Sequence, residues 1–178
     1  MKKWLGVAVL LLAAPAMAQA RTWQLQSSTL TYHVVHPLHH AEGVSHAARG
    51  KGVCQAGTCN FLVAAPVKSF QSGDTNRDLH MLQVTRGAQY PMVVVRVTVP
   101  LAELHPGTLK ADLEVQFAGQ DVHYAQVPFQ ISAQGKDLVL SGTVPATLTD
   151  FKITPPELLM MPIRNQIPVT VRMTWAPG

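Results

Sequence analysis

Apolar and polar residues alternate with a period of two along most of the chain between Trp23 and Trp175. Successive side chains of a β-strand point to opposite faces, so this alternation predicts strands that are apolar on one face. Gly, Pro and Asp separate the alternating runs at regular intervals, and about eight such runs predict an antiparallel sandwich or barrel. The runs comprise residues 30–35, 44–53, 61–66, 92–99, 109–117, 122–131, 138–148 and 167–175.

One or two segments break the period of two and predict short helices. In residues 72–87, SGDTNRDLHMLQVTRG, Thr75 and Asp78 have the spacing of a helix N-terminus, and Leu79 and Leu82 fall on one face. We expect an amphipathic helix that lies across one end of the barrel. In residues 155–163, PPELLMMPI, the opening Pro-Glu pair suits a first helical turn. Its apolar, Met-rich continuation fits either a core plug or a rim that faces a ligand.

The first 20 residues have the pattern of a secretory signal: two lysines, a short apolar run and small residues before Ala20. We expect cleavage there and a single mature domain over residues 21–178, in the periplasm or secreted. The apolar run is too short for a transmembrane helix, no later stretch is long enough, and no cysteine follows the small residues. The sequence therefore predicts no stable membrane anchor.

Composition narrows the class of protein further. Only 13% of the residues are charged while 47% are hydrophobic, and the net charge is +4. The basic residues are scattered singly and are not interleaved with aromatic residues, so we expect no nucleic-acid partner.

The two cysteines, Cys54 and Cys59, are separated by four residues. If residues 55–58 form the loop of a β-hairpin, the two cysteines face each other closely enough for a disulfide, which the oxidising compartment favours. The alternative is a metal site of the two thiols with His46 and a further ligand.

Five of the eight histidines lie in residues 31–46, TYHVVHPLHHAEGVSH. His33 and His36 point to opposite faces of a regular strand, so they cannot chelate one ion. A surface site from His36, His39 and His40 stays open as an alternative, although only one acid, Glu42, is close by. We expect no dedicated metal site.

No catalytic motif is present: the chain has no nucleophile elbow, zinc-protease helix or phosphate loop. Arg77, Asp78 and His80 can cap the predicted helix and fix it to the barrel instead. We therefore expect no enzyme activity. The consecutive apolar residues of MVVVRVTV, residues 92–99, fit either a filled core or a barrel that encloses a small apolar ligand.

Three segments resemble the YceI-like family of secreted polyisoprenoid-binding proteins. They are the first hairpin (residues 31–50), the helix Asn76-Arg77-Asp78-Leu79-His80-Met81 with its following Tyr-Pro, and the turn Asp150-Phe151-Lys152-Ile153. The resemblance covers essentially the whole predicted mature chain. It implies an all-β fold, a lipocalin-like eight-stranded antiparallel barrel, whose interior holds a long apolar chain of isoprenoid, quinone or fatty-acid type.

The resemblance also implies roles for particular residues, and it implies no enzyme activity and no cofactor besides the bound ligand. Arg77, Asp78, His80 and Asp150 brace the helix and the pocket. The resemblance does not fix which residues touch the ligand. Their apolar character predicts this contact for Leu79, Leu82, Phe151, Leu158 and Met160, and we add His36, whose place the family pattern also marks. Two alternatives remain open: a periplasmic protein that handles metal or haem through the histidine run, and a filled barrel that acts as an interaction module. The chain is expected to be a monomer or a homodimer.

Overall fold

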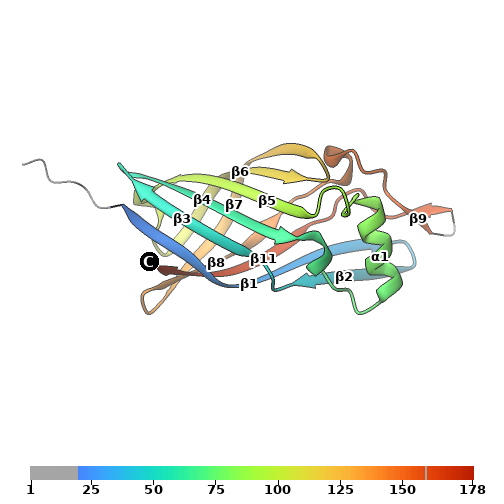
Figure 1. The fold of residues 1–178 in the computed structure, drawn as a ribbon, viewed down its shortest axis with the longest axis horizontal. Coiled ribbons are helices and arrows are strands. Elements are labelled where there is room, and N and C mark those ends of the chain that lie inside the picture. Colours follow the sequence, from blue (N-terminus) through green and yellow to red (C-terminus); the bar gives the residue numbers. More distant parts are fainter. Residues whose placement is uncertain (1–19, 159) are drawn as a thin grey trace, which may run out of the picture.

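The computed structural model describes residues 20–158 and 160–178, and most of them form one antiparallel sheet (Figure 1). The predicted signal segment lies, apart from Ala20, outside the described residues. The strands of this sheet are β1 (Arg21–His36), β2 (His39–Ser45), β3 (Arg49–Gln55), β4 (Thr58–Pro66), β5 (Met92–Pro100), β6 (Gly107–Phe117), β7 (Gln120–Gln134), β8 (Asp137–Val144) and β11 (Val169–Pro177).

Pairing between the first and last strands closes the sheet into a barrel. Consecutive strands pair from β3 to β8, β8 pairs with β11, and β11 pairs with β1 over Trp23–Tyr32. The first residues of β1 then pair with β3, which completes a closed barrel of eight strands. The predicted lipocalin-like barrel is therefore confirmed, and closure removes the exposed strand edges that invite aggregation.

Strand β1 is long enough to pair with two partners on one side. Arg21–Gln24 pair with β3, and Leu30–His36 pair with β2, which extends beyond the closed part of the barrel. Residues 46–48 carry the chain from one partner position to the next. The single strand predicted over residues 44–53 is therefore wrong: it is the end of β2 and most of β3.

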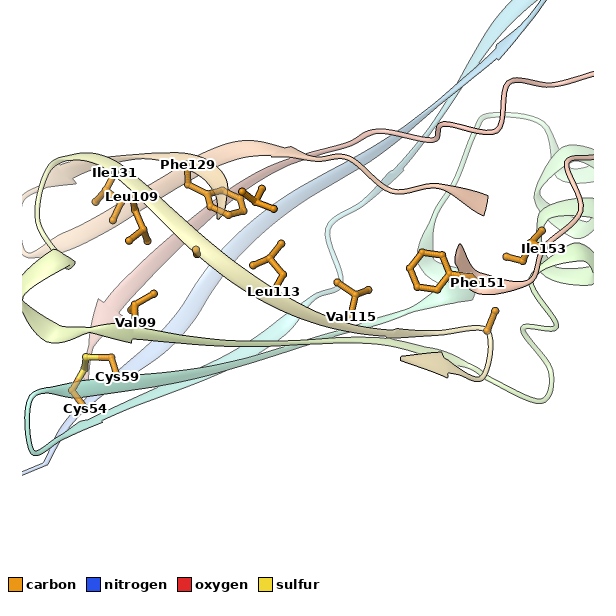
Figure 2. Packing of buried hydrophobic residues seen from close by; sticks show 13 residues of the cluster. Cys54, Cys59, Val99, Leu109, Leu113, Val115, Phe129, Ile131, Phe151 and Ile153 are labelled. Carbon is orange, nitrogen blue, oxygen red and sulfur yellow. A yellow bond between two sulfur atoms is a disulfide. The ribbon is translucent and has the colours of Figure 1, made fainter. Parts of the chain in front are cut away.

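The barrel interior follows from the period of two. In β6 the buried residues are Leu109, Ala111, Leu113 and Val115, while the residues between them are exposed. Figure 2 shows the side chains of Leu109, Leu113 and Val115 inside the barrel wall, with those of Val99 and Phe129. Burial of such side chains stabilises the fold by roughly 1.5–3 kcal/mol each.

The predicted helix is present as α1 (Thr75–Val84), beside one end of the barrel (Figure 1). Its N-cap is Asp74, one residue before the position that the sequence suggested: the Asp74 carboxylate accepts a hydrogen bond from the Arg77 backbone N–H. The described residues also form three short 3₁₀ helices: η1 (Val67–Ser69), η2 (Leu101–Glu103) and η3 (Leu148–Phe151).

The second irregular segment forms a small hairpin and not a helix. It consists of β9 (Glu157–Leu158) and β10 (Met161–Pro162), and it projects at the same end of the barrel as α1 (Figure 1). The strand predicted over residues 138–148 ends earlier, at Val144, because the chain then turns into η3.

Cys54 and Cys59 form the predicted disulfide, as directly opposed residues of the β3–β4 hairpin. Both are buried at the end of the barrel opposite α1 (Figures 1 and 2).

Candidate functional site

The barrel encloses a cavity of about 830 Å³. Its wall is overwhelmingly apolar. The strands β5 and β6 contribute alternate side chains to it, four from β5 and five from β6: Val93, Val95, Val97 and Val99, and Leu109, Ala111, Leu113, Val115 and Phe117. A volume of this size is at the upper end of the range for small-molecule sites. The side chains of the barrel therefore do not fill its interior.

Aromatic side chains line the cavity at the end away from α1. Trp23, Phe61 and Trp175 lie there, and the rings of Phe61 and Trp175 meet edge to face with centroids 5.1 Å apart. Small residues on β3 make room for them: a Cβ atom on Gly50 would lie 2.6 Å from Trp175, and one on Gly52 would lie 2.4 Å from Phe61.

The helix α1 contributes a mixed polar and apolar face to the other end of the cavity. Arg77, His80, Met81 and Val84 line it, at the spacing of residues on one side of a helix. The outward residues of α1 are solvated.

Tyr32 and Glu157 add polar atoms to the same end. The Tyr32 ring packs against the Phe70 ring, with centroids 5.8 Å apart. It also lies over Gly43, because a Cβ atom on this glycine would be 2.5 Å from the Tyr32 hydroxyl oxygen. Burial raises the pKa of Tyr32, and the negative charge of Asp78 adds to the effect, so this hydroxyl stays protonated at neutral pH.

A second tyrosine ties η3 to the barrel wall beside the cavity. The Tyr124 hydroxyl donates a hydrogen bond to Asp150 (3.3 Å) and accepts one from the Thr147 backbone N–H (3.4 Å). Burial is the main cause that raises the pKa of Tyr124 to about 12.

Of the residues predicted to contact ligand, Phe151 is the one that the structure places in the cavity wall, 2% exposed. Leu79 is 53% exposed and Met160 is 92% exposed; neither lines the cavity, so their positions do not support the predicted contact. Leu82 is half-buried but packs toward Gly87 and not into the cavity wall. The side chain of Leu158 lies outside the described part of the structure.

The residues predicted to brace the helix divide into two groups. Asp78 accepts hydrogen bonds from the Ser72 backbone N–H (2.9 Å) and hydroxyl (2.6 Å), and Asp150 holds Tyr124, so both positions fit a bracing role. Arg77 and His80 line the cavity instead. The only ion pair of Arg77 among the described residues is a loose contact with Asp74 (3.7 Å).

His36 is 2% exposed and lies outside the main cavity. Its Nδ1 atom accepts a hydrogen bond from the Leu38 backbone N–H, and its Nε2 atom lies 3.2 Å from the Met161 carbonyl oxygen. It therefore joins the tip of the β1–β2 hairpin to β10. A small hollow separate from the cavity adjoins it, between His40 and Arg164.

The other histidines whose side chains the structure describes form no joint site; the side chain of His39, part of the alternative site with His36 and His40, lies outside the described part of the structure. His33 and His36 point to opposite faces, as the alternation predicted. His33 points outward, and its nitrogens contact Glu42 (3.0 Å) and Thr170 (3.2 Å) on the barrel surface. Among the side chains that the structure describes, which do not include that of His39, no three of His, Cys, Asp or Glu are grouped so that they could hold a metal ion.

Sequence reasoning missed Met81 and Val84 of α1. Their spacing from Arg77 was a usable signal, but Leu79 and Leu82 form a second apolar face on the same helix. The inward valines of β5 were also missed, because the apolar Val94 lies between them and hides the alternation.

A closed eight-stranded barrel with an apolar cavity belongs to the lipocalin-like class of small-molecule binding folds. Three solved structures with this fold are similar to the chain. A polyisoprenoid-binding domain from Saccharophagus degradans, implicated in plant cell wall breakdown, superposes with a TM-score of 0.67 at 14% identity, over 88% of this chain and 98% of that one.

The second is BcnA of Burkholderia cenocepacia, with a TM-score of 0.68 at 12% identity, over 83% of this chain and 95% of that one. The third is a YceI protein of Campylobacter jejuni, with a TM-score of 0.54 at 16% identity, over 67% and 72%. Neither a family model nor the sequence of a curated protein matches the chain. The comparisons confirm the YceI-like fold that the resemblance implied.

Proposed function

We propose that this chain is an exported lipid-binding protein, which carries or sequesters a long apolar molecule of isoprenoid, quinone or fatty-acid type inside its barrel. The observation that carries the proposal is the apolar cavity of about 830 Å³. Each methylene group moved from water into such a cavity contributes about 0.8 kcal/mol, so a long chain binds with few polar contacts.

Two further observations support this function. The S. degradans neighbour is described as a polyisoprenoid-binding domain, although its low identity transfers only the fold. The large internal volume also argues against the filled-barrel alternative. We place the protein in the periplasm or outside the cell, since residues 1–20 have the pattern of a cleaved signal, and we assign it no catalytic role. No helix within the described ranges is long and apolar enough to cross a bilayer.

A matched pair of variants on α1 tests whether the cavity is the binding site. Met81 lines the cavity, whereas Leu79 is exposed on the other side of the same helix. We expect Met81→Gln to weaken the binding of a fluorescent fatty acid by roughly tenfold, because it places an amide in the apolar wall. Leu79→Gln should leave the dissociation constant unchanged, which titrations of the two delipidated variants will measure.

Circular dichroism of both variants controls for folding. If Leu79→Gln weakens binding and Met81→Gln does not, the ligand lies outside the barrel and the proposed site is wrong.

A further inference from the structure

In the described part of the cavity wall, the ionisable side chains gather at one end. The ionisable side chains in its wall are all on α1, on the strand β1 beside it, or on segments near η3 and β9: Tyr32, Asp74, Arg77, His80, Tyr124 and Glu157. The opposite end presents Trp23, Phe61 and Trp175, where the buried indole N–H of Trp23 has no partner among the described residues. A polar head group at this end would find no ionisable side chain and few donors to replace its water, which costs several kcal/mol and favours entry of an amphiphile with its tail first.

We propose that the ligand is an amphiphile with an uncharged head group at the α1 end, whose oxygen atoms accept hydrogen bonds, and with its tail directed toward Trp23 and Trp175. This inference rests on the proposed lipid-binding function and deepens it, since it specifies the class of head group.

Two side chains at the α1 end have donors to offer. Arg77 is 3.7 Å from Asp74, which is longer than a hydrogen bond, so its guanidinium keeps donors available for a ligand. The Tyr32 hydroxyl makes no hydrogen bond to any part of the protein that the structure describes. Both therefore suit a head group with acceptor oxygens, such as a hydroxyl or a carbonyl.

The charges at this end argue against an anionic head group. Arg77 is the only permanently cationic side chain in the described cavity wall, and two carboxylates, Asp74 and Glu157, share that wall. A third carboxylate, Asp78 on α1, does not line the cavity, but its charge acts on Tyr32. Lys68 and Arg164 lie on neighbouring segments but do not line the cavity. A carboxylate or phosphate head would thus meet more negative than positive charge.

Four ligands with the same number of carbon atoms in their isoprenoid chains separate the effects of tail and head. Phytane has no head group, geranylgeraniol has a hydroxyl, geranylgeranoic acid a carboxylate, and geranylgeranyl phosphate a phosphate. We expect geranylgeraniol to bind delipidated wild-type protein about threefold or more tightly than the acid at neutral pH, with the phosphate weaker still. Tighter binding of the acid or of the phosphate would overturn the proposal.

Two variants identify the groups responsible. Arg77→Gln should weaken geranylgeraniol binding by roughly three- to tenfold, the effect of one hydrogen bond, and leave phytane unaffected. Glu157→Gln should strengthen binding of the acid by roughly two- to fivefold and leave geranylgeraniol unaffected. Glu114→Gln is the matched control, because Glu114 is exposed on the outer face of β6 and does not line the cavity.

Tryptophan quenching tests the direction of the ligand. With Trp4→Phe in the full chain, Trp23 and Trp175 are the only tryptophans, and both line the cavity. A long-chain alcohol brominated at its last carbon should quench their fluorescence more strongly than one brominated beside the hydroxyl. The reverse order would contradict the proposed orientation.

The outcomes distinguish this inference from the function on which it rests. If none of the four ligands binds, phytane included, the lipid-binding function itself is wrong. If all four bind with equal affinity, the cavity binds apolar chains but does not select the head group, and only the present inference fails.

Discussion

At the scale of single residues, Tyr124 shows how a polar group is accommodated in an apolar wall. Its ring lies 6.5 Å from that of Phe151, while its hydroxyl is satisfied by Asp150 and by the Thr147 backbone. The same hydroxyl therefore fixes η3, and with it the buried Phe151, against β7. The pKa of Tyr124 is raised mainly because a phenolate at this position would lose hydration.

This raised pKa predicts a loss of stability in alkaline solution. The pKa is about 12 in the folded protein and about 10 in the unfolded chain, so the folded state retains a proton that the unfolded state has lost. The stabilisation is complete below about pH 10 and is lost as the pH rises toward about 12. Urea unfolding across this range should show a steeper fall in unfolding free energy for wild type than for Tyr124→Phe. Equal slopes would show that Tyr124 does not cause the fall.

At the scale of elements, the β3–β4 hairpin shapes the end of the barrel opposite α1. The inward positions of β3 are Gly50, Gly52 and Cys54, all small, and the rings of Phe61 and Trp175 occupy the space that they leave. Small residues opposite large ones allow this end to close with aromatic packing.

We expect Gly50→Ala to destabilise the fold by about 1–3 kcal/mol, because the added methyl group overlaps the Trp175 ring and forces it to move. Gly135→Ala serves as a comparison that tests backbone strain without a steric overlap. A Cβ atom at Gly135 has no other atom within 4 Å, but the backbone φ of +64° disfavours any residue with a side chain. Chemical denaturation will measure both, and the fluorescence of Trp175 should change only in Gly50→Ala. An unchanged spectrum and an unchanged stability in Gly50→Ala would contradict the packing described.

The disulfide between Cys54 and Cys59 closes a short loop, so its contribution to stability is small. The chain-entropy relation gives about 2 kcal/mol for a loop of this length. The double variant Cys54→Ala/Cys59→Ala should lose about that much unfolding free energy. It should also keep its affinity for ligand, because neither cysteine lines the cavity. Lost binding in a folded double variant would show that the disulfide shapes the site.

At the scale of the whole molecule, the period of two predicted an antiparallel sandwich or barrel without choosing between them, and the resemblance added the lipocalin-like, eight-stranded barrel. The pairing of β1 could not be predicted in the same way. This strand pairs with both β2 and β3 because residues 46–48 connect the two along its edge, and no local sequence pattern encodes that connection. The side of α1 that faces the cavity could also not be predicted from the sequence. Leu79 and Met81 are both apolar, and only the way the helix packs on the barrel places Met81 in the cavity wall and leaves Leu79 exposed.

Native mass spectrometry on the protein, purified without detergent from the compartment to which it is exported, tests the central claim most directly. Our account predicts a mass in excess of the polypeptide, released by organic solvent as a long-chain lipid, and the same excess when delipidated protein is offered isoprenoid or fatty ligands. Bare polypeptide that takes up none of these ligands would contradict the claim that the cavity holds an apolar chain.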